Sequence, residues 1–368
     1  MGPVTFPLAA FAQHRLDRLA ALAPGARLPS ANDLMLERAR LNHLSVPGTT
    51  SAGGGCRFYR ASDGWVALNL ARSDDAALLP ALFMREDATG LDTLFAASRE
   101  SEIVARGRTL GLAIAGLGEI PVSPAITSTA EGPSGIRPPH RVLDLSALWA
   151  GPLASRLLRL TGCEVTRVES IGREDPLSRS DPAHSEALNQ GKHTVRIDLR
   201  THEGREALRS LIAASDIVIE AARPRALQQL GICADEIVRH RTGLTWVTIT
   251  GHGMAGEAAE WIAFGDDAGI AGGLSRELHA ASGSIGFVGD AIADPLTGIA
   301  VAQMALSEAM AGGGTRIVVS MSGLVAEGIA WSKARDPEAW STELRRWAGL
   351  RGASFPDAAD AVREPAPC

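Results

Sequence analysis

The chain has 368 residues and a mass of 38.5 kDa, enough for two domains of ordinary size. Hydrophobic residues make up 45% and charged residues 21%, which is typical of a globular protein and excludes a disordered or fibrous one. The net charge of -6 argues against nucleic acid as a partner. The N-terminal residues lack the pattern of a signal peptide, and no run of about 18 apolar residues occurs, so we expect a cytoplasmic protein with no membrane partner.

Four cysteines, Cys56, Cys163, Cys233 and Cys368, lie far apart and form no CxxC pair. This spacing is typical neither of a disulfide framework nor of a zinc ribbon. We therefore expect a reducing compartment and no metal site.

The first third of the chain contains helical segments, a glycine-rich loop at Gly53-Gly54-Gly55 and a short strand pattern at residues 65–70. Helical patterns follow near residues 74–83 and 99–111. Residues 129–140 are rich in Pro and Gly and carry no apolar period, so they predict a linker.

Beyond the linker, short strands rich in β-branched residues alternate with helices, among them 152–160 and 202–214. This alternation predicts an α/β fold, a parallel sheet covered by helices on both faces. Residues 331–368 lack a long apolar period, and we expect a peripheral helix and a tail there. The predicted strands span 141–145, 164–169, 193–199, 216–220, 244–250 and 315–320.

One GxGxxG pattern, Gly251 to Gly256, follows the strand at 244–250. A dinucleotide site also needs a following helix and an acidic residue about 20 positions on. An Ala/Glu-rich and then Gly-rich stretch follows instead, so we interpret the pattern as a glycine turn.

Asp294 precedes Pro295 and opens an apolar run at 299–306. Asp followed by Pro is typical of an N-cap and the first helical position, so we expect Asp294 to cap a helix of about four turns. The structural interpretation is that Asp294 only caps the helix. The functional one is a nucleophile, because a helix N-terminus favours the carboxylate. Asp290, on the approach loop, is the second candidate.

Two basic segments could contact an anion. Lys192 is one of only two lysines and lies in a turn before a strand, a position that fits either a solvated side chain or an anion contact. Arg223 and Arg225 flank Pro224 at the end of a predicted strand and the start of a helix, a combination that suits a phosphate.

Taken together, these segments resemble the class III CoA-transferase (CaiB/BaiF) family, including formyl-CoA transferase and the related α-methylacyl-CoA racemases. The resemblance covers residues 140–330 in sequence order. Its pieces are Val142-Leu-Asp-Leu-Ser-Ala-Leu-Trp-Ala-Gly-Pro152, Val165-Thr-Arg-Val-Glu169, Leu188-Asn-Gln-Gly-Lys192, Asp216-Ile-Val-Ile-Glu220, Leu230-Gly231, Ala293-Asp294 and Arg316-Ile-Val-Val-Ser320.

The resemblance implies a Rossmann-like domain at 141–330, a second smaller α+β domain and an interlocked homodimer. It implies an enzyme that moves CoA between an acyl-CoA and a small carboxylic acid through an aspartyl-CoA intermediate, with Asp294 as nucleophile. Residues 1–128 are similar to the small domain, which in most members follows the large one. Gly53, Gly54 and Gly55 would then be the loop that closes over the intermediate.

Coenzyme A, bound as an acyl-CoA substrate, is the cofactor that the resemblance implies. Gln229 stands at the position where formyl-CoA transferase-like members carry an Arg that contacts CoA phosphates. Thr250 stands at a second position where they carry a basic residue. The implied CoA contacts are Trp149, Ala150, Lys192, Ala221, Ala222, Arg223, Arg225, Gln229, Leu230 and Thr250.

Two alternatives remain open. In a racemase or isomerase-type variant, Asp294 would be one acid/base group, with Asp266 or Asp267 as its partner, and protons would exchange at the α-carbon of the acyl group. The His of the racemases' Gly-His-Asp segment is absent from Gly265-Asp-Asp267. The other alternative is a non-catalytic acyl-CoA-binding subunit, suggested by the altered residues at 229 and 250.

Overall fold

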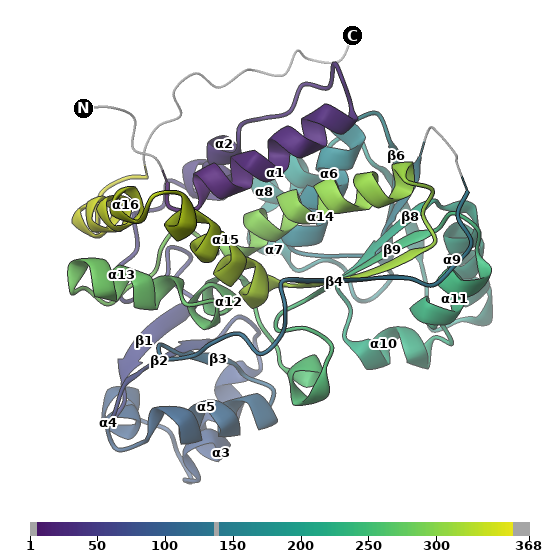
Figure 1. The fold of residues 1–368 in the computed structure, drawn as a ribbon. Helices are drawn as coiled ribbons and strands as arrows, with labels where there is room; N and C mark the ends of the chain where they lie inside the picture. Colours follow the sequence, from purple (N-terminus) through teal and green to yellow (C-terminus); the bar gives the residue numbers. More distant parts are fainter. Residues whose placement is uncertain (1–5, 136–139, 356–368) are drawn as a thin grey trace.

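The computed structural model describes residues 6–135 and 140–355, and it contains two β-sheets of different size (Figure 1). The larger sheet has seven strands in the order β4-β10-β9-β8-β5-β6-β7, all parallel except β4, which pairs antiparallel with β10. The predicted α/β fold is confirmed. Its strands are β4 (Ile126–Ala130), β5 (Arg141–Asp144), β6 (Glu164–Ser170), β7 (His193–Ile197), β8 (Ile217–Glu220), β9 (Thr245–Thr250) and β10 (Thr315–Ser320).

Helices cover both faces of this sheet, as the alternating pattern predicted (Figure 1). On one face lie α6 (Ala150–Leu160) and α14 (Ala293–Met310), with α1 (Ala9–Leu22) and α2 (Ala31–Leu41) stacked outside α14. The other face carries α9 (His202–Ala214) and α11 (Ala234–His240). Helices that border these layers are α7 (Leu177–Ser180), α8 (Pro182–Asn189), α10 (Pro224–Gln229), α12 (Gly265–Ala271), α13 (Leu274–Ser282), α15 (Met321–Arg335), α16 (Pro337–Gly349) and η2 (Gly256–Glu260).

The smaller sheet is antiparallel, with the order β1-β2-β3, and has its own helices and its own hydrophobic core. One face of the sheet packs against α12, so a third cluster of buried side chains joins the two parts. The elements of this part are β1 (Cys56–Arg60), β2 (Trp65–Asn69), η1 (Asp75–Leu78), α3 (Leu79–Phe83), α4 (Leu91–Ala96), α5 (Glu100–Thr109) and β3 (Ala113–Gly116).

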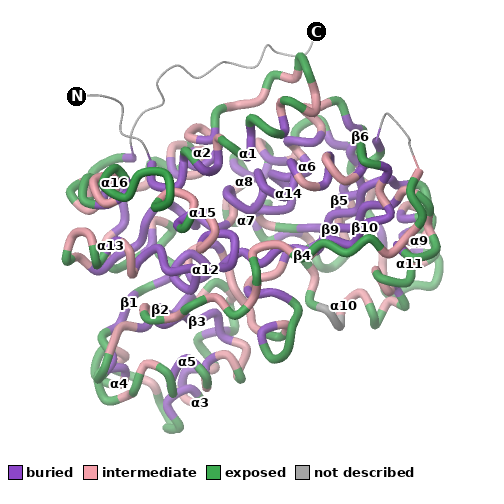
Figure 2. The backbone as a smooth tube through the Cα atoms, viewed as in Figure 1, coloured by how far each residue is buried: buried purple, intermediate pink, exposed green. Residues whose placement is uncertain are grey.

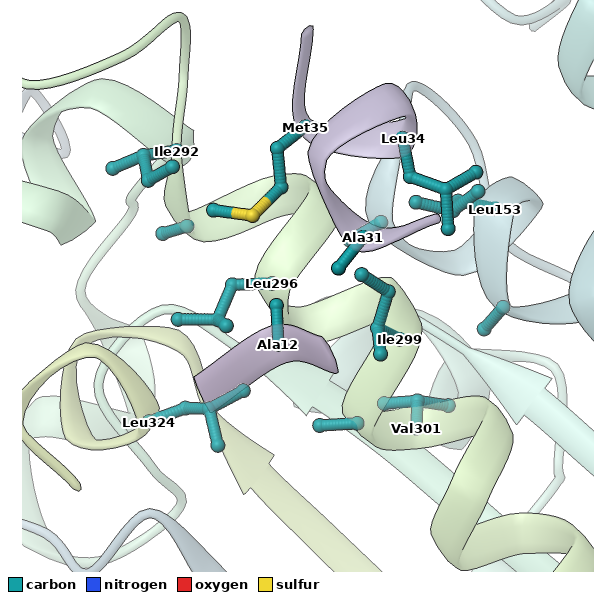
Figure 3. Close-up of a cluster of buried hydrophobic side chains, with 14 of the residues drawn as sticks. Ala12, Ala31, Leu34, Met35, Leu153, Ile292, Leu296, Ile299, Val301 and Leu324 are labelled. Atoms are coloured by element: carbon teal, nitrogen blue, oxygen red, sulfur yellow. The ribbon is translucent and has the colours of Figure 1, made fainter. Parts of the chain in front are cut away.

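Residues 1–128, predicted as one small-domain-like segment, are divided between the two parts. Helices α1 and α2 belong to the large layer, because their apolar faces pack on α14. Figure 3 shows Met35 of α2 near Leu296 of α14, and Ala31 of α2 near Ile299 of α14. Only residues from about 56 to 116 form the small sheet and its helices.

The predicted linker begins inside β4, since Thr129 and Ala130 pair with Arg316 and Thr315 of β10. Its residues 136–139, and residues 356–368 of the predicted tail with Cys368, lie outside the described residues. The predicted peripheral helix is α16, which buries Trp340 and Trp347. Among the described cysteines, Cys56, Cys163 and Cys233 are free thiols, as expected. No helix in the described part of the chain is long and apolar enough to cross a membrane.

Candidate active site

The carboxyl ends of β5, β8 and β9 open into a cavity of about 270 Å³. Loops that follow parallel strands meet at this edge of a sheet, which is where α/β proteins bind ligands. Ala147, Ala222 and Gly251 come from the three loops, and Asp294 of α14 also lines the cavity. Of the two nucleophile candidates, Asp294 and Asp290, it is therefore Asp294 that faces the cavity.

The start of α14 differs from the prediction. The N-cap residue is Ile292 and carries no side-chain cap, so the expectation that Asp294 caps the helix is wrong. Asp294 is the second helical residue. The helix is 18 residues long, about five turns, where about four were expected. The reason is the turn before it: Gly289 and Ala291 have φ values of 80° and 44°, which begins the helix one residue before Asp294. The Asp294 carboxylate therefore points into the site and is not used to cap its own helix.

The backbone of Gly265 holds the Asp294 carboxylate from the side of α12. Its N–H donates a hydrogen bond to that carboxylate. A Cβ at Gly265 would collide with the Asp294 carboxylate and with the carbonyl of Ala291, so only glycine allows this approach. The segment Gly265-Asp266-Asp267 thus positions the nucleophile candidate through its first residue.

Burial raises the pKa of Asp294 to about 7, and the negative charges of Asp266 and Asp290 act in the same direction. Arg38, a nearby cation, limits the rise. Burial also raises the pKa of Asp266 to about 6 and that of Asp267 to about 7. Three carboxyl groups of one cluster therefore titrate near neutral pH.

Arg38 reaches this cluster from helix α2. Its Nε donates to Asp290 Oδ2 at 2.8 Å, and its Nη2 donates to the other carboxylate oxygen. The guanidinium carbon lies 5.0 Å from the centre of the Trp149 ring, within the range of a cation–π contact. Nothing in the local sequence marks Arg38, because its ion-pair partner is 252 residues away.

The glycine loop lies against the same cluster. A Cβ on Gly53 would be 3.2 Å from Nη2 of Arg38, and one on Gly55 would be 3.4 Å from Asn69. The Ser51 hydroxyl donates to Asp266, and Asn69 donates to Asp267 at 2.8 Å. Gly53, Gly54 and Gly55 are exposed (Figure 2 shows burial along the chain), so the loop covers the cluster from the solvent side.

A second cavity of about 450 Å³ adjoins the first, and Ala147 and Ala222 line both. Its walls include Gln229 and Leu230 of the predicted CoA contacts, together with Arg173 and Arg200. Arg200 is paired with Asp198 at 2.8 Å.

Other predicted contacts fall in different places. Ala150, Ala221, Arg223 and Thr250 line the first cavity. Lys192 lines neither cavity: its ammonium is buried and donates to Asp144 at 3.2 Å and to the Pro152 carbonyl at 2.8 Å. The interpretation of Lys192 as a solvated turn residue is therefore wrong.

Trp149 is buried, with its ring between Arg38 and His184, and lines neither cavity. The structure places Arg225 in the first turn of α10 and describes nothing of its side chain. The glycine turn at 251–256 leads into the 3-10 helix η2, as expected for a turn and not for a dinucleotide site.

Comparison with known proteins decides the family. The profile described as CoA-transferase family III matches residues 139–353, more than half of the 368 residues. The chain belongs to CoA-transferase family III. The resemblance seen in the sequence is thereby confirmed at the level of the family, whereas a particular likeness to formyl-CoA transferase or to the racemases is not shown.

Two curated members of the family share limited stretches with the chain. It is 33% identical over 154 residues to the succinyl-CoA–D-citramalate CoA-transferase of Chloroflexus aurantiacus, covering 38% of each chain. It is 29% identical over 196 residues to the (R)-2-hydroxy-4-methylpentanoate CoA-transferase of Clostridioides difficile, covering 49% of each. The chain thus spans between about a third and a half of the curated relatives that it matches.

Among solved structures, the crystal structure of the hypothetical protein Rv3272 from Mycobacterium tuberculosis aligns with a TM-score of 0.48 and 24% identity, over 56% of this chain and 58% of that one. The family profile begins at residue 139, so Arg38 and the glycine loop lie outside it.

Proposed function

We propose that the chain transfers CoA from an acyl-CoA to a carboxylic acid, with Asp294 as the nucleophile. The Asp294 carboxylate attacks the thioester carbonyl and expels the CoA thiolate, which leaves a mixed anhydride. The thiolate then attacks the aspartyl carbonyl, forming aspartyl-CoA and releasing the first acid. An acceptor acid repeats the two steps in reverse, so covalent catalysis divides the exchange into easier steps.

The observation that carries the proposal is the position of Asp294 in a cavity that continues into a second one. Coenzyme A is a long molecule with a reactive thiol at one end and a phosphorylated nucleotide at the other. The first cavity contains Asp294, and the second lies along β5, β6 and β8 beyond Ala147 and Ala222. This arrangement accommodates the thioester beside Asp294 and the nucleotide in the second cavity.

Positive charge supports the same orientation. Arg223 in the first cavity and Arg173 in the second are exposed, and neither forms an ion pair with a described residue. Free guanidinium groups bind phosphate oxygens in bidentate fashion. Arg223 and Arg173 would therefore compensate for Gln229 and Thr250, which replace the basic residues of related enzymes.

The surroundings of Asp294 suit a nucleophile. With a pKa of about 7, a substantial fraction of the carboxylate is ionised at neutral pH. The Gly265 N–H and the first turn of α14 place backbone donors beside the reacting carboxyl group, where an oxyanion would develop. Gly53 to Gly55 would shield the intermediate from water. The active form that we propose is a homodimer.

The proton-transfer alternative has less support. Neither Asp266 nor Asp267 lines the cavity that contains Asp294. Asp266 accepts from the Ala291 N–H and the Ser51 hydroxyl, and Asp267 accepts from Asn69 and the Phe264 N–H. Both carboxyl groups thus have partners within the protein and no path to a substrate carbon.

Two measurements on the purified chain test the proposal. Titration calorimetry with free CoA should give micromolar binding, near -8 kcal/mol. Exchange of radiolabelled succinate into succinyl-CoA, chosen because several relatives are named for succinyl-CoA, should then proceed without another acceptor. Absence of CoA binding would overturn the proposal. Binding without exchange, repeated with other acyl-CoA and acid pairs, would favour a non-catalytic subunit.

A further inference from the structure

Four aspartates gather at the start of α14 and α12: Asp266, Asp267, Asp290 and Asp294. All four are buried or nearly so, and Asp290 has no exposed surface. Burying several like charges is unfavourable unless a cation compensates for them. Arg38 is the cation that bonds directly to this cluster, through both oxygens of Asp290.

Arg38 is held rigidly in that position. Helix α2 packs on α14 through Ala31 and Met35, as Figure 3 shows, so the two ends of the ion pair belong to elements that share one core. The Trp149 ring supports the guanidinium from one side at 5.0 Å, and Gly53 approaches it from another. The side chain is 21% exposed, whereas that of Asp290 is 0% exposed. Asp290, Trp149 and Gly53 thus contact the Arg38 guanidinium from different sides.

We propose that Arg38 is a positioning residue of the active site: it compensates for the charge of the aspartate cluster around Asp294 and connects that cluster to the glycine loop. Its role in catalysis rests on the proposed function. Its place in the cluster does not, because it follows from the ion pair with Asp290 and from the contacts with Trp149 and Gly53.

The charged groups that face Asp294 come from three segments. Arg38 on α2 favours the ionised carboxylate, whereas Asp266 on α12 and Asp290 on the loop before α14 oppose it. The Gly265 N–H also favours the ionised form. Removing Arg38 should therefore raise the pKa of Asp294, and removing the charge of Asp290 should lower it. Removing both should leave it near its original value.

This opposition gives an electrostatic signature that a structural role alone would not produce. Arg38→Met, Asp290→Asn and the double variant are compared with Arg40→Met, a matched control on the same helix whose guanidinium pairs with Asp33. The readout is the carboxyl infrared band of Asp294, identified by its loss in Asp294→Asn and followed against pH. It needs no substrate.

We expect Arg38→Met to raise the apparent pKa of Asp294 by about 1 to 2 units and Asp290→Asn to lower it by a similar amount. The double variant and Arg40→Met should titrate within about half a unit of the unaltered chain. Arg38→Lys, which keeps the charge, should recover most of the shift. If Arg38→Met does not fold, Asp290→Asn and the double variant still carry the test.

The inference is overturned if Asp290→Asn leaves the Asp294 titration unmoved, or if Arg38→Met changes only the stability. Failure of the proposed function would give a different set of results. In that case the unaltered chain forms no CoA adduct, while the infrared band still shifts among the variants as stated.

Discussion

Asp144 and Asp294 both lie at the carboxyl edge of the large sheet, Asp144 fully buried and Asp294 partly buried, yet their surroundings differ completely. Asp144 accepts from the Lys192 ammonium at 3.2 Å, from the Ser146 N–H at 3.0 Å and from the hydroxyls of Ser146 and Ser155. Burial alone would raise the pKa of Asp144, but these partners lower it overall. Asp294 accepts from the Gly265 N–H and has no directly bonded cation among the described residues, and its pKa is raised.

Under the proposed function, this difference separates a structural acid, Asp144, from a reactive one, Asp294. The charge of Asp144 is fully compensated and turned away from the cavities, so it ties β5, α6 and the turn at Lys192 together. Asp294 faces a cavity and lacks that compensation, so forming a bond to a substrate removes an unfavourable buried charge. Buried aspartates with perturbed pKa values in a cavity are typical of functional sites.

The largest expected effect comes from Asp294→Asn. The amide cannot attack a thioester, so succinate exchange into succinyl-CoA should fall by more than about 10⁴-fold. Asp74→Asn, an exposed acid in the small part, is the control and should exchange normally. Exchange within tenfold of the unaltered rate in Asp294→Asn would remove this residue from the mechanism.

Lys192→Met breaks the Asp144 side of the comparison. It leaves Asp144 as an unpaired buried charge, so the free energy of unfolding should fall by about 3–5 kcal/mol in urea denaturation. Asp144→Asn/Lys192→Met, which removes both charges, should recover most of that loss.

A loss below about 1 kcal/mol in Lys192→Met would show that the ion pair is not the main support of this region. Calorimetry on the folded variant tests the predicted CoA contact as well. Unchanged affinity would assign Lys192 a structural role alone, whereas a tenfold loss would show that it also contacts CoA.

The two aspartates should give stability opposite dependence on pH. The folded-state pKa of Asp294, about 7, lies above its usual value of 3.8, so its contribution is greatest at low pH and is lost as pH rises towards and through 7. The stability of the unaltered chain relative to Asp294→Asn should therefore fall by about 2 kcal/mol between pH 5 and pH 8.

For Asp144 the sign is reversed, because its pKa is lowered, and its contribution is lost as pH falls below the usual value. Urea denaturation at the two pH values, on the unaltered chain and Asp294→Asn, measures the difference. Equal slopes for the two proteins would mean that Asp294 is not buried as a poorly compensated acid.

The smallest effects are expected at the cavity mouths. Arg223→Ala and Arg173→Ala each remove one exposed cation, so the Kd for CoA should rise about five- to tenfold, near 1 kcal/mol. Arg85→Ala, on the small part, serves as the control. If neither arginine changes the Kd, the phosphates of CoA lie elsewhere.

Much of the large sheet could be predicted from the sequence, because its strands are continuous β-branched runs separated by amphipathic helices. The predicted helix 202–214 coincides with α9, and the strand 315–320 with β10. Strand β4 was missed: its residues Ile126–Ala130 are mostly exposed and polar, and only the pairing with β10 makes them a strand.

The site was less predictable than the fold. The local sequence around Asp294 was enough to predict a turn followed by a helix. It did not predict where the helix begins, because Ala291 adopts an unusual positive φ. Arg38 carries no local signal, since its partner Asp290 lies 252 residues along the chain. Arg173 carries none either, because it lines a cavity whose walls come from several segments. Lys192 was a prominent residue in the sequence, but its partner Asp144 lies 48 residues away.

The central claim, that Asp294 carries the CoA group, is tested most directly by locating the covalent intermediate. The protein is mixed with succinyl-CoA, or with whichever acyl-CoA supports exchange, and treated with borohydride, which reduces an aspartyl thioester to an alcohol. Peptide mass spectrometry then identifies the altered residue. We predict reduction at Asp294 alone, dependent on acyl-CoA and absent without it. Reduction at another carboxylate, or none while exchange proceeds, would contradict it.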